Sequence, residues 1–420
     1  MALALACDRV LPGLVDCYLG PPRLRRDHTA GPSPTPTELS ARVTWLRTEV
    51  CRCGMAGHRR DFLDHQLIAL QCALRRASGA PVGYREEVLA YFDTEISLGE
   101  PDRYRVAHGE LDELLPGRGP LAERLAAHRE RLTVGRGALL PSAQRLTAAL
   151  RTLARRREAV PEGGDSDGDS VELTLVADRP WSASHRYLGG YRSRVMLNTD
   201  VELGPTQLAR LVAHETYPGH HAEYARAERL VRSPQGPLRP EMAVSLVNTP
   251  QCLISEGRAD LGLDVLVGPS YGGWVAEVLD GLAPVGDLEL AVAVERAMLA
   301  LLPVRQDAAL LLHDRGAGEA EVLGHLSRWL LVGERRARQT LRFIAHPVWR
   351  AYTTTYVEGR RLVGEWLNAP SFNAASAGDS VTERYLRLLD EPRSPSALRA
   401  ALALTSTAEQ SCPRSPMKPM

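Results

Sequence analysis

The chain has 420 residues, of which 44% are hydrophobic, 24% are charged and only 5% are aromatic. This hydrophobic fraction is ordinary for a globular protein with a core, and the scarcity of aromatic residues favours helices over sheets. Basic and acidic residues each number 51, so the formal net charge is zero. A polyanionic partner, either a nucleic acid or an anionic membrane surface, is therefore not expected.

The seven cysteines are odd in number and scattered, which excludes a disulfide-dense scaffold and favours a reducing compartment. The N-terminal stretch MALALAC has a faint similarity to a lipoprotein cleavage site. It lacks a basic segment, however, and its apolar run is shorter than a signal peptide requires. No apolar run approaches the roughly 20 residues that cross a bilayer. We therefore expect a cytoplasmic protein without a membrane partner.

The N-terminal region, residues 1–160, is predicted to be helical. Thr35, Pro36 and Glu38 form a capping-box pattern that opens the first clear helix. Apolar residues then recur at helical spacing in RRDFLDHQLIALQCALRRA and again in AQRLTAALRTLARRREAV. These stretches predict a helical layer.

An acidic segment, PEGGDSDGDSVE, follows the helical region. Asp165, Asp167 and Asp169 alternate like the start of a calcium-binding loop. The glycine at the sixth loop position and the glutamate at the twelfth are missing, and Val176 occupies the latter position. The segment is therefore predicted to be a solvated acidic loop.

Residues 171–201 contain the only clear strand pattern. VELTLVAD and SRVMLNTDV alternate as strands do, and RYLGGYR between them predicts a turn-rich connector. Helical patterns return at Pro205 and persist to about residue 403, whereas residues 404–420 are predicted to be a disordered tail. The fold class is thus predicted to be mainly α with a small antiparallel β-sheet, in which residues 161–403 form one continuous domain with the N-terminal region.

The stretch HETYPGHH, residues 214–221, begins like the zinc-binding pattern H-E-x-x-H, in which two histidines four residues apart share one helix face. His214 and Glu215 extend the apolar stripe that begins at Leu208, so both side chains are predicted to point inward. A buried glutamate without a partner is costly, which favours a metal ion or a charged partner nearby. Position 218, where the second histidine is expected, is Pro218.

A helix break at Pro218 and Gly219 can restore the second ligand. On an unbroken helix His220 would lie about 120° around the axis from His214, and His221 would lie roughly 10 Å further along it. Proline lacks an N–H and glycine adopts backbone angles that other residues avoid, so the helix is predicted to kink or bulge. A bulge that absorbs two residues would bring His220 to the ligand position. His220 is preferred as the second ligand, and His221 remains the alternative.

The third ligand is expected to be a carboxylate on a nearby helix. In LISEGRADLGLDVL, Glu256 and Asp260 are four residues apart and share one helix face. The pair resembles the E-x-x-x-D arrangement of thermolysin-like zinc peptidases, the gluzincins, in which the glutamate binds zinc and the aspartate orients a ligating histidine.

The chain resembles a bacterial family labelled domain of unknown function 885. The similarity rests on HETYPGHH, EGRAD and YTTTYVEGRRLV and covers roughly residues 170–400. It implies a mostly helical, gluzincin-like zinc hydrolase with His214, His220 and Glu256 as ligands and Glu215 as general base. Many members of the family have E-G-W-A where this chain has EGRA, a departure that leaves the substrate open.

Three protein ligands leave a coordination position for water, and Glu215 is expected to take its proton and deliver it to the leaving amine. Tyr356, in the family-like C-terminal segment, is the first candidate for a second oxyanion donor, ahead of His313. Asn198 lies in the strand before the zinc helix. That strand is expected to be an edge strand that could hold an extended peptide, so Asn198 and His313 are predicted substrate contacts.

The preferred hypothesis is a zinc-dependent metallopeptidase with one zinc ion per chain, which cleaves peptide bonds by zinc-activated water. The alternatives are hydrolysis of another amide or ester by the same chemistry, and a helical binding or scaffold protein with a vestigial metal site. A peptide or small amide is the expected partner. The preferred peptide, endo- or exopeptidase action and the oligomeric state stay open at this point.

Overall fold

A computed structural model describes residues 1–29, 31–160, 168–179, 181–233, 239–369 and 380–410. The prediction of a mainly helical protein with a small sheet is confirmed. The helices up to residue 231 are α1 (Ala2–Asp8), α2 (Pro22–Thr29), α3 (Pro36–Arg52), α4 (Gly57–Ala77), α5 (Tyr84–Phe92), α6 (Pro101–Leu114), α7 (Leu121–Arg131), α8 (Arg136–Arg156), α9 (Pro205–Glu215) and α10 (His220–Val231).

The remaining helices are η1 (Pro240–Ala243), α11 (Pro250–Leu266), α12 (Gly272–Val278), α13 (Leu288–Leu299), α14 (Pro303–His313), α15 (Glu319–Leu330), α16 (Glu334–Ala345), η2 (Thr355–Gly359), α17 (Arg360–Asn368), α18 (Val381–Asp390) and α19 (Pro395–Gln410). The strands are β1 (Val15–Tyr18), β2 (Ser170–Val176), β3 (Ala183–Tyr187), β4 (Arg192–Asn198) and β5 (Val244–Leu246). Within the described residues, no helix is both long and apolar enough to span a bilayer.

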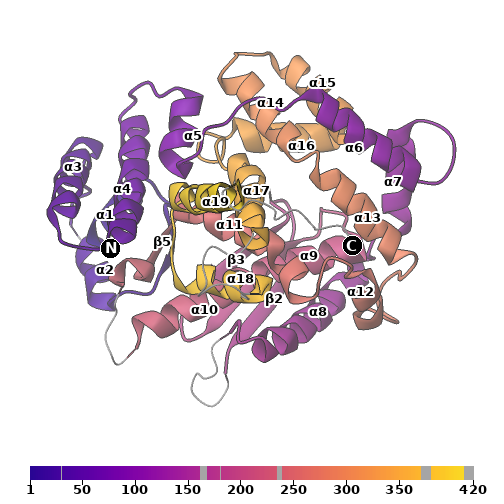
Figure 1. Ribbon diagram of the computed structural model, residues 1–420, viewed down its shortest axis with the longest axis horizontal. Coiled ribbons are helices and arrows are strands. Elements are labelled where there is room, and N and C mark those ends of the chain that lie inside the picture. The colour runs from indigo at the N-terminus through magenta and orange to yellow at the C-terminus, as the bar shows by residue number, and fades with distance from the viewer. Residues whose placement is uncertain (30, 161–167, 180, 234–238, 370–379, 411–420) are drawn as a thin grey trace, which may run out of the picture.

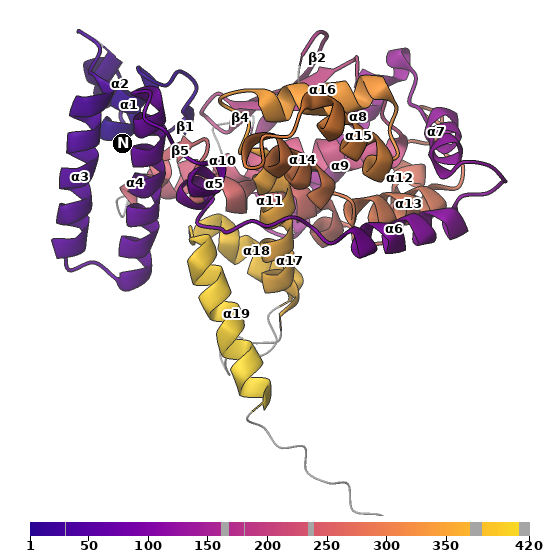
Figure 2. The ribbon, with the colours of Figure 1, turned by 90° about the horizontal axis from the view of Figure 1, so that it is seen from above.

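The first four helices form an N-terminal lobe at one side of the molecule (Figure 2). The predicted capping box at the start of α3 is confirmed, because Glu38 N donates to Thr35 Oγ1 at 3.2 Å and Thr35 N donates to Glu38 Oε2 at 2.8 Å. Strand β1 was not predicted. It pairs antiparallel with β5, where Val15 faces Leu246, and so joins the lobe to a segment more than 200 residues later in the chain.

The main sheet has the order β2-β4-β3. Strands β3 and β4 pair antiparallel, which agrees with the predicted antiparallel sheet, but β2 and β4, the two strands that the sequence predicted, run parallel to each other. The predicted connector, residues 186–192, includes the end of β3. The observed turn between β3 and β4 is shorter than this connector and contains Gly189 and Gly190, which have φ angles of +78° and +64°. Strand β4 lies between two neighbours, so the expectation that it is an edge strand with a free edge is wrong.

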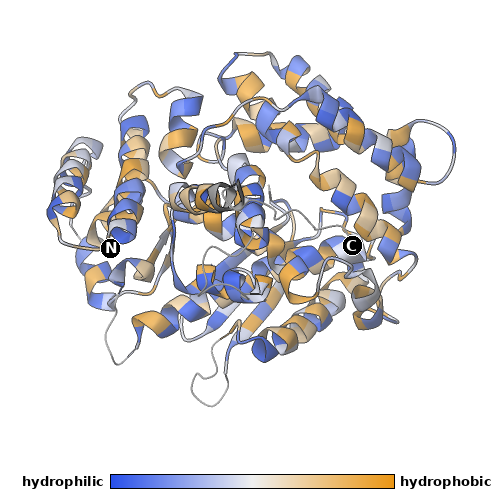
Figure 3. Ribbon diagram, viewed as in Figure 1, coloured by the Kyte–Doolittle hydropathy of each residue, from blue (hydrophilic) through white to orange (hydrophobic). Residues whose placement is uncertain are grey.

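Helix α11 runs through the middle of the molecule, where α9, α17 and η2 pack against it (Figure 1). Most outer helices alternate hydrophobic and hydrophilic residues, as amphipathic helices do (Figure 3). On α11, by contrast, Glu256 and Arg258 are as buried as Leu253 and Ile254. A helix with buried charges on it requires polar partners from its neighbours.

A glycine pair sets the distance between α11 and η2. A Cβ atom added to Gly257 would lie 2.2 Å from the backbone carbon and oxygen of Gly359, and one added to Gly359 would lie 2.3 Å from the backbone oxygen of Leu253. The two backbones therefore touch where neither residue has a side chain. This close approach holds the C-terminal segment YTTTYVEG beside the centre of α11.

The C-terminal end differs from the prediction. Helix α19 continues to Gln410, so residues 404–410 are helical rather than part of a disordered tail. No proline interrupts the sequence between Pro395 and Pro413, and the polar residues after Leu404 do not by themselves end a helix. Residues 411–420 lie outside the described residues.

We predict that Gly257→Ala lowers the free energy of unfolding by about 1–3 kcal/mol, because the added methyl group overpacks the contact with η2. Gly364→Ala on α17 is the matched control, since its Cβ would lie 3.8 Å from Leu261 Cδ1, an ordinary contact distance. Alanine favours a helix over glycine by about 1 kcal/mol, so the control is expected to be neutral or stabilising. Urea unfolding followed by circular dichroism measures both. Equal stability of the two variants would contradict the close approach.

Candidate metal centre

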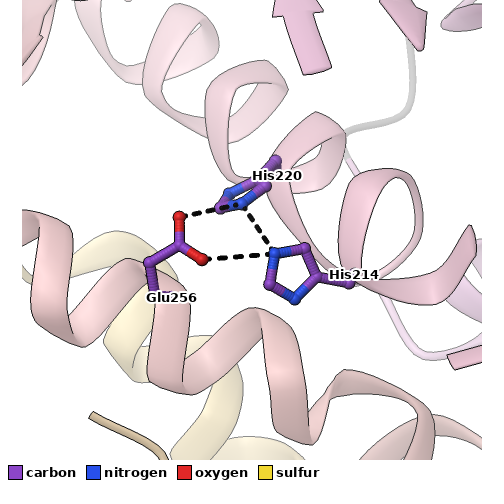
Figure 4. A group of neighbouring side chains, drawn as sticks. All are labelled: His214, His220 and Glu256. Carbon is purple, nitrogen blue, oxygen red and sulfur yellow. Dashed lines mark hydrogen bonds and ion pairs between the residues drawn. The ribbon is translucent and has the colours of Figure 1, made fainter. Parts of the chain in front are cut away.

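Three side chains from three helices converge on one point (Figure 4). His214 lies in the last turn of α9, His220 is the first residue of α10, and Glu256 lies in the middle of α11. The Nε2 atoms of the two histidines are 3.2 Å apart. Glu256 Oε2 lies 3.3 Å from His214 Nε2, and Glu256 Oε1 lies 3.4 Å from His220 Nε2. All three residues are buried, and they form a group that can hold a metal ion.

The segment between α9 and α10 determines which histidine joins the cluster. Helix α9 ends at Glu215, and a tight turn over residues 216–219 precedes α10, so two helices replace the single bulged helix that was predicted. A Cβ atom on Gly219 would lie 1.9 Å from the backbone oxygen of His214. Only glycine fits here, and the turn brings His220 back beside His214.

His221 points away from the cluster. Its Nδ1 atom lies 2.7 Å from Ser193 Oγ on β4, and its Nε2 atom lies 3.5 Å from Asp169 Oδ2. The ring is fully buried. His221 therefore connects α10 to the sheet and lies outside the His214, His220 and Glu256 group.

Asp169 corrects the prediction of a solvated acidic loop. Its side chain is buried and accepts hydrogen bonds from Arg151, Arg155 and Tyr217. Burial alone would raise the pKa of Asp169, but His221, Tyr217 and the two arginines outweigh it and hold the pKa well below its usual range. Arg151 and Arg155 on α8 make this burial possible, because their charges compensate that of Asp169. The local sequence around Asp169 contains no sign of these distant partners. Asp165 and Asp167 lie outside the described residues.

A second layer of polar groups orients the three converging side chains. Asp260 Oδ1 lies 2.9 Å from His214 Nδ1, so an Nδ1–H donated to Asp260 leaves the Nε2 lone pair directed into the cluster. The hydroxyl of Tyr352 donates to Glu256 Oε1 at 2.8 Å. Glu223 Oε2 lies 3.7 Å from His220 Nδ1 and forms an ion pair with Arg258. Each of the three converging residues thus has its own polar support.

The donor atoms are suited to a cation. Burial alone would lower the pKa of His220, but Glu256 and Glu223 outweigh it and raise the pKa to about 10. His220 and His214 hold the pKa of Glu256 well below its usual value, although burial opposes this. Glu256 Oε2 is buried and accepts no hydrogen bond among the described residues. A metal ion would satisfy this oxygen and replace the protons on the imidazoles.

Glu215 lies beside the cluster with its carboxylate uncommitted. It is buried, and within the described part of the chain its side chain has no hydrogen bond or ion pair. Burial raises the pKa of Glu215, and His214 and His220 oppose the rise. A buried carboxylate with a raised pKa next to a cation site is suited to proton transfer.

The structure places Tyr356 near the cluster and the other two predicted contacts away from it. The Tyr356 ring centroid is 6.5 Å from that of His214, and no described residue forms a hydrogen bond with its hydroxyl. His313 Nε2 instead lies 2.7 Å from the backbone oxygen of Ile344. Asn198 is buried and donates to the backbone oxygens of Arg179 and Trp181, so it stabilises the end of β4 rather than contacting substrate.

Three polar residues around the cluster were not predicted. Tyr352 precedes Tyr356 by four residues, one helical turn, and that spacing could have identified it. The His185 ring on β3 lies 5.9 Å from the His220 ring. Asp16 on β1 accepts a hydrogen bond from Tyr224, and burial raises its pKa. No local pattern connects β1 or β3 to α10, so sequence spacing could not have identified Asp16 or His185.

No family model and no curated protein match the chain. A structure described as a putative lipoprotein from Colwellia psychrerythraea is similar, with 16% identity and a TM-score of 0.53 over 86% of this chain and 66% of that chain. Another, a putative lipoprotein of unknown function from Shewanella oneidensis, has 13% identity and a TM-score of 0.50 over 91% of this chain and 75% of that chain. This chain thus spans slightly less than two thirds of the first structure. At these identities the similarity shows the fold alone.

The expectation of a cytoplasmic location is contradicted by these two structures, because both are described as lipoproteins. The expectation relied on the scattered cysteines, on the weak signal-peptide pattern of MALALAC and on the lack of a bilayer-spanning apolar run. Six cysteines in the described residues are free thiols, which agrees with the absence of a disulfide framework. A chain that needs no disulfides can fold in more than one compartment, so the cysteine pattern was a poor guide, and a cytoplasmic location is not retained.

We predict that His220→Ala abolishes stoichiometric metal binding, whereas His221→Ala retains it, because only the His220 ring faces His214 and Glu256. Metal content after dialysis, measured by inductively coupled plasma mass spectrometry, tests the pair. His221→Ala is expected to lower thermal stability instead, since it removes a buried contact with Ser193 and Asp169. Loss of metal from His221→Ala with retention in His220→Ala would reverse the assignment of the two histidines.

Proposed function

We propose that the chain is a zinc-dependent metallopeptidase. The observation that supports this function most strongly is the buried group of two imidazoles and one carboxylate, with the unpaired Glu215 beside it. Two histidines and a glutamate with an open coordination position are typical of catalytic zinc sites, whereas structural zinc sites are closed by four protein ligands.

The separation of the donor atoms supports zinc. Bonds of about 2.0–2.1 Å at tetrahedral angles place neighbouring ligand atoms about 3.3 Å apart. The three contacts between His214, His220 and Glu256 measure 3.2, 3.3 and 3.4 Å. The two contacts of Glu256 are made by its two different oxygens, and one ligand atom from each residue lies within 4.8 Å of the other two, so a small adjustment of the Glu256 carboxylate would bring a single oxygen to a tetrahedral ion. The donation from His214 to Asp260 adds the carboxylate–histidine support that zinc ligands commonly have.

When bound, zinc supplies a Lewis acid that polarises an amide carbonyl and acidifies water. The roles of the chain's own residues follow from their positions. Glu215 would accept a proton from the attacking water and deliver it to the leaving amine, and its raised pKa favours the first of these transfers. The Tyr356 hydroxyl, which no described residue engages, is available as a hydrogen-bond donor to the developing oxyanion.

The arrangement of the helices supports a gluzincin-like architecture and membership of the domain of unknown function 885 family. In that architecture the two histidines come from one segment and the glutamate from a following helix, which also provides the second-layer aspartate. Here α11 provides both Glu256 and Asp260, and the glycine of the YVEG segment packs directly on the glycine of the EGRAD segment. The motifs that suggested the family are therefore in contact with one another.

We predict that Glu215→Gln retains metal but loses about 10² to 10⁴ in kcat, because the substitution preserves shape and removes the base. Turnover is measured by mass spectrometry on a peptide library and, in parallel, on panels of small amides and esters. Cleavage of amides or esters alone would replace the peptidase by a related hydrolase. Absence of turnover in the parental, metal-loaded protein on all panels would contradict a hydrolytic function.

Substitutions at two neighbouring tyrosines distinguish a role in catalysis from a role in supporting the metal ligands. Tyr356→Phe is expected to retain metal and lose about 10² to 10³ in kcat, because one oxyanion donor is removed. Tyr352→Phe removes the hydrogen bond to Glu256 and is expected to weaken metal binding by about 10- to 100-fold. Metal titration and steady-state kinetics on both variants test the assignment. An unchanged kcat in Tyr356→Phe would exclude its hydroxyl from the reaction.

A further inference from the structure

A cavity of about 190 Å³ lies next to the metal centre, on the side of Asp260 and Tyr356. Its wall includes three arginines from three elements, Arg210, Arg305 and Arg360, together with Leu299 and Leu302. Tyr356, the proposed oxyanion donor, therefore belongs both to the surroundings of the cluster and to this cavity. A group bound in the cavity would be adjacent to the reacting bond.

Two of the cavity arginines have an ion-pair partner within the protein. Arg210 and Arg360 both form ion pairs with Asp264, at 3.1 and 3.3 Å, and both donate to the backbone oxygen of Asp260. The carboxylate of Asp260 itself is engaged by His214. Arg210 and Arg360 therefore share one carboxylate, and both guanidiniums are held in place by contacts within the protein.

Arg305 is different. Its Nε atom is buried without a hydrogen-bond partner, and among the described residues its guanidinium has no ion pair. Burial and the nearby Arg336 lower its pKa. Asp260 is the acidic group that acts on Arg305 without forming an ion pair with it. A half-buried guanidinium without an ion pair is stabilised when an anion binds to it.

The surroundings of Arg305 add positive charge. Arg129 on α7 and Arg336 on α16 also have no side-chain hydrogen bond or ion pair in the part of the chain that the structure describes. Burial lowers the pKa of Arg129, Arg336 and Arg305 lower it further, and Glu295 opposes the change, so Arg129 lies in a region where positive charge predominates. Mutual repulsion of unpaired arginines is relieved by an anionic ligand.

We propose that this cavity binds a carboxylate group of the peptide substrate, with Arg305 as the contacting residue and Arg129 and Arg336 as the source of an attractive field. The proposal rests on the peptidase function proposed above and specifies its substrate class, namely peptides with a carboxylate on the Tyr356 side of the scissile bond. A guanidinium binds a carboxylate through two parallel hydrogen bonds, which would fix the peptide in one direction across the metal centre. The carboxylate is either the C-terminus or an acidic side chain.

Binding is tested separately from catalysis. Metal-loaded Glu215→Gln protein is dialysed against three pools of acetylated random tripeptides, and the bound fraction is measured by mass spectrometry. One pool has free C-terminal carboxylates, one has C-terminal amides without acidic residues, and one has amides with a single glutamate. Preference for the first pool identifies a C-terminal carboxylate, and preference for the third identifies an acidic side chain. The preferred pool is expected to bind about tenfold or more tightly than the neutral pool, as expected for hydrogen bonds between charged groups.

Substitutions in the same background identify the contact. Arg305→Gln is expected to abolish the preference without loss of metal, and Arg336→Gln, at an exposed position where folding is not at risk, is expected to reduce it. Arg335→Gln is the matched control, because the Arg335 side chain next to Arg336 is 88% exposed, and it should leave the preference unchanged. Equal or absent binding of all pools, or a full preference retained in both Arg305→Gln and Arg336→Gln, would overturn the proposal. If the anionic pool binds preferentially but the parental protein cleaves no peptide, the peptidase function fails and the carboxylate site stands.

Discussion

The structure depends on the burial of ionisable groups along α11. Glu256 and Arg258 lie in the interior, and Asp260 lies one turn further on; none of them could remain there without polar partners. Each neighbouring element provides one. Helix α9 provides His214, α10 provides His220 and Glu223, and α18 provides the backbone oxygen of Leu388 for Arg258. The helices are thus positioned by charge as well as by apolar packing, and the metal centre is the point where these requirements meet.

Glycine makes these contacts geometrically feasible. Gly219 allows the chain to reverse between α9 and α10 within van der Waals distance of the His214 carbonyl. Gly257 and Gly359 allow the backbones of α11 and η2 to touch, which places Tyr352 and Tyr356 over the cluster. The π-helical turn of η2 is a conformation that is rare in proteins and is frequently found at functional sites. The polar groups of the site therefore depend on residues that have no side chain.

Local sequence patterns predicted those features of the site whose residues lie close together in the chain. Glu256 and Asp260 share a face because they are four residues apart, and the break at Pro218 and Gly219 follows from the chemistry of those two residues. Both expectations concern atoms within about two helical turns of one another. The form of the break was less accurate, since the helix ends and restarts instead of bulging.

What could not be predicted involves partners far apart in the chain. The burial of Asp169 depends on arginines of α8, and the central position of β4 depends on a parallel pairing with β2. No periodic pattern in the sequence indicates that these arginines contact Asp169, and none indicates the order of the strands in the sheet. The unpaired state of Arg305 is also a property of the assembled structure, because an arginine looks the same in the sequence whether or not a carboxylate lies beside it.

The pairing of β1 with β5 has a consequence for how the protein assembles. Residues 15–18 leave the ribosome more than 200 residues before their partners at 244–246 are made. Until then β1 has an open edge, and the N-terminal helices cannot complete the hydrophobic cluster that Val244 and Leu246 close. Contacts of such long sequence separation slow folding and prolong the lifetime of incomplete states. Because β5 leads almost directly into α11, the N-terminal lobe becomes complete in the same stage of synthesis that delivers Glu256, the last residue of the metal centre.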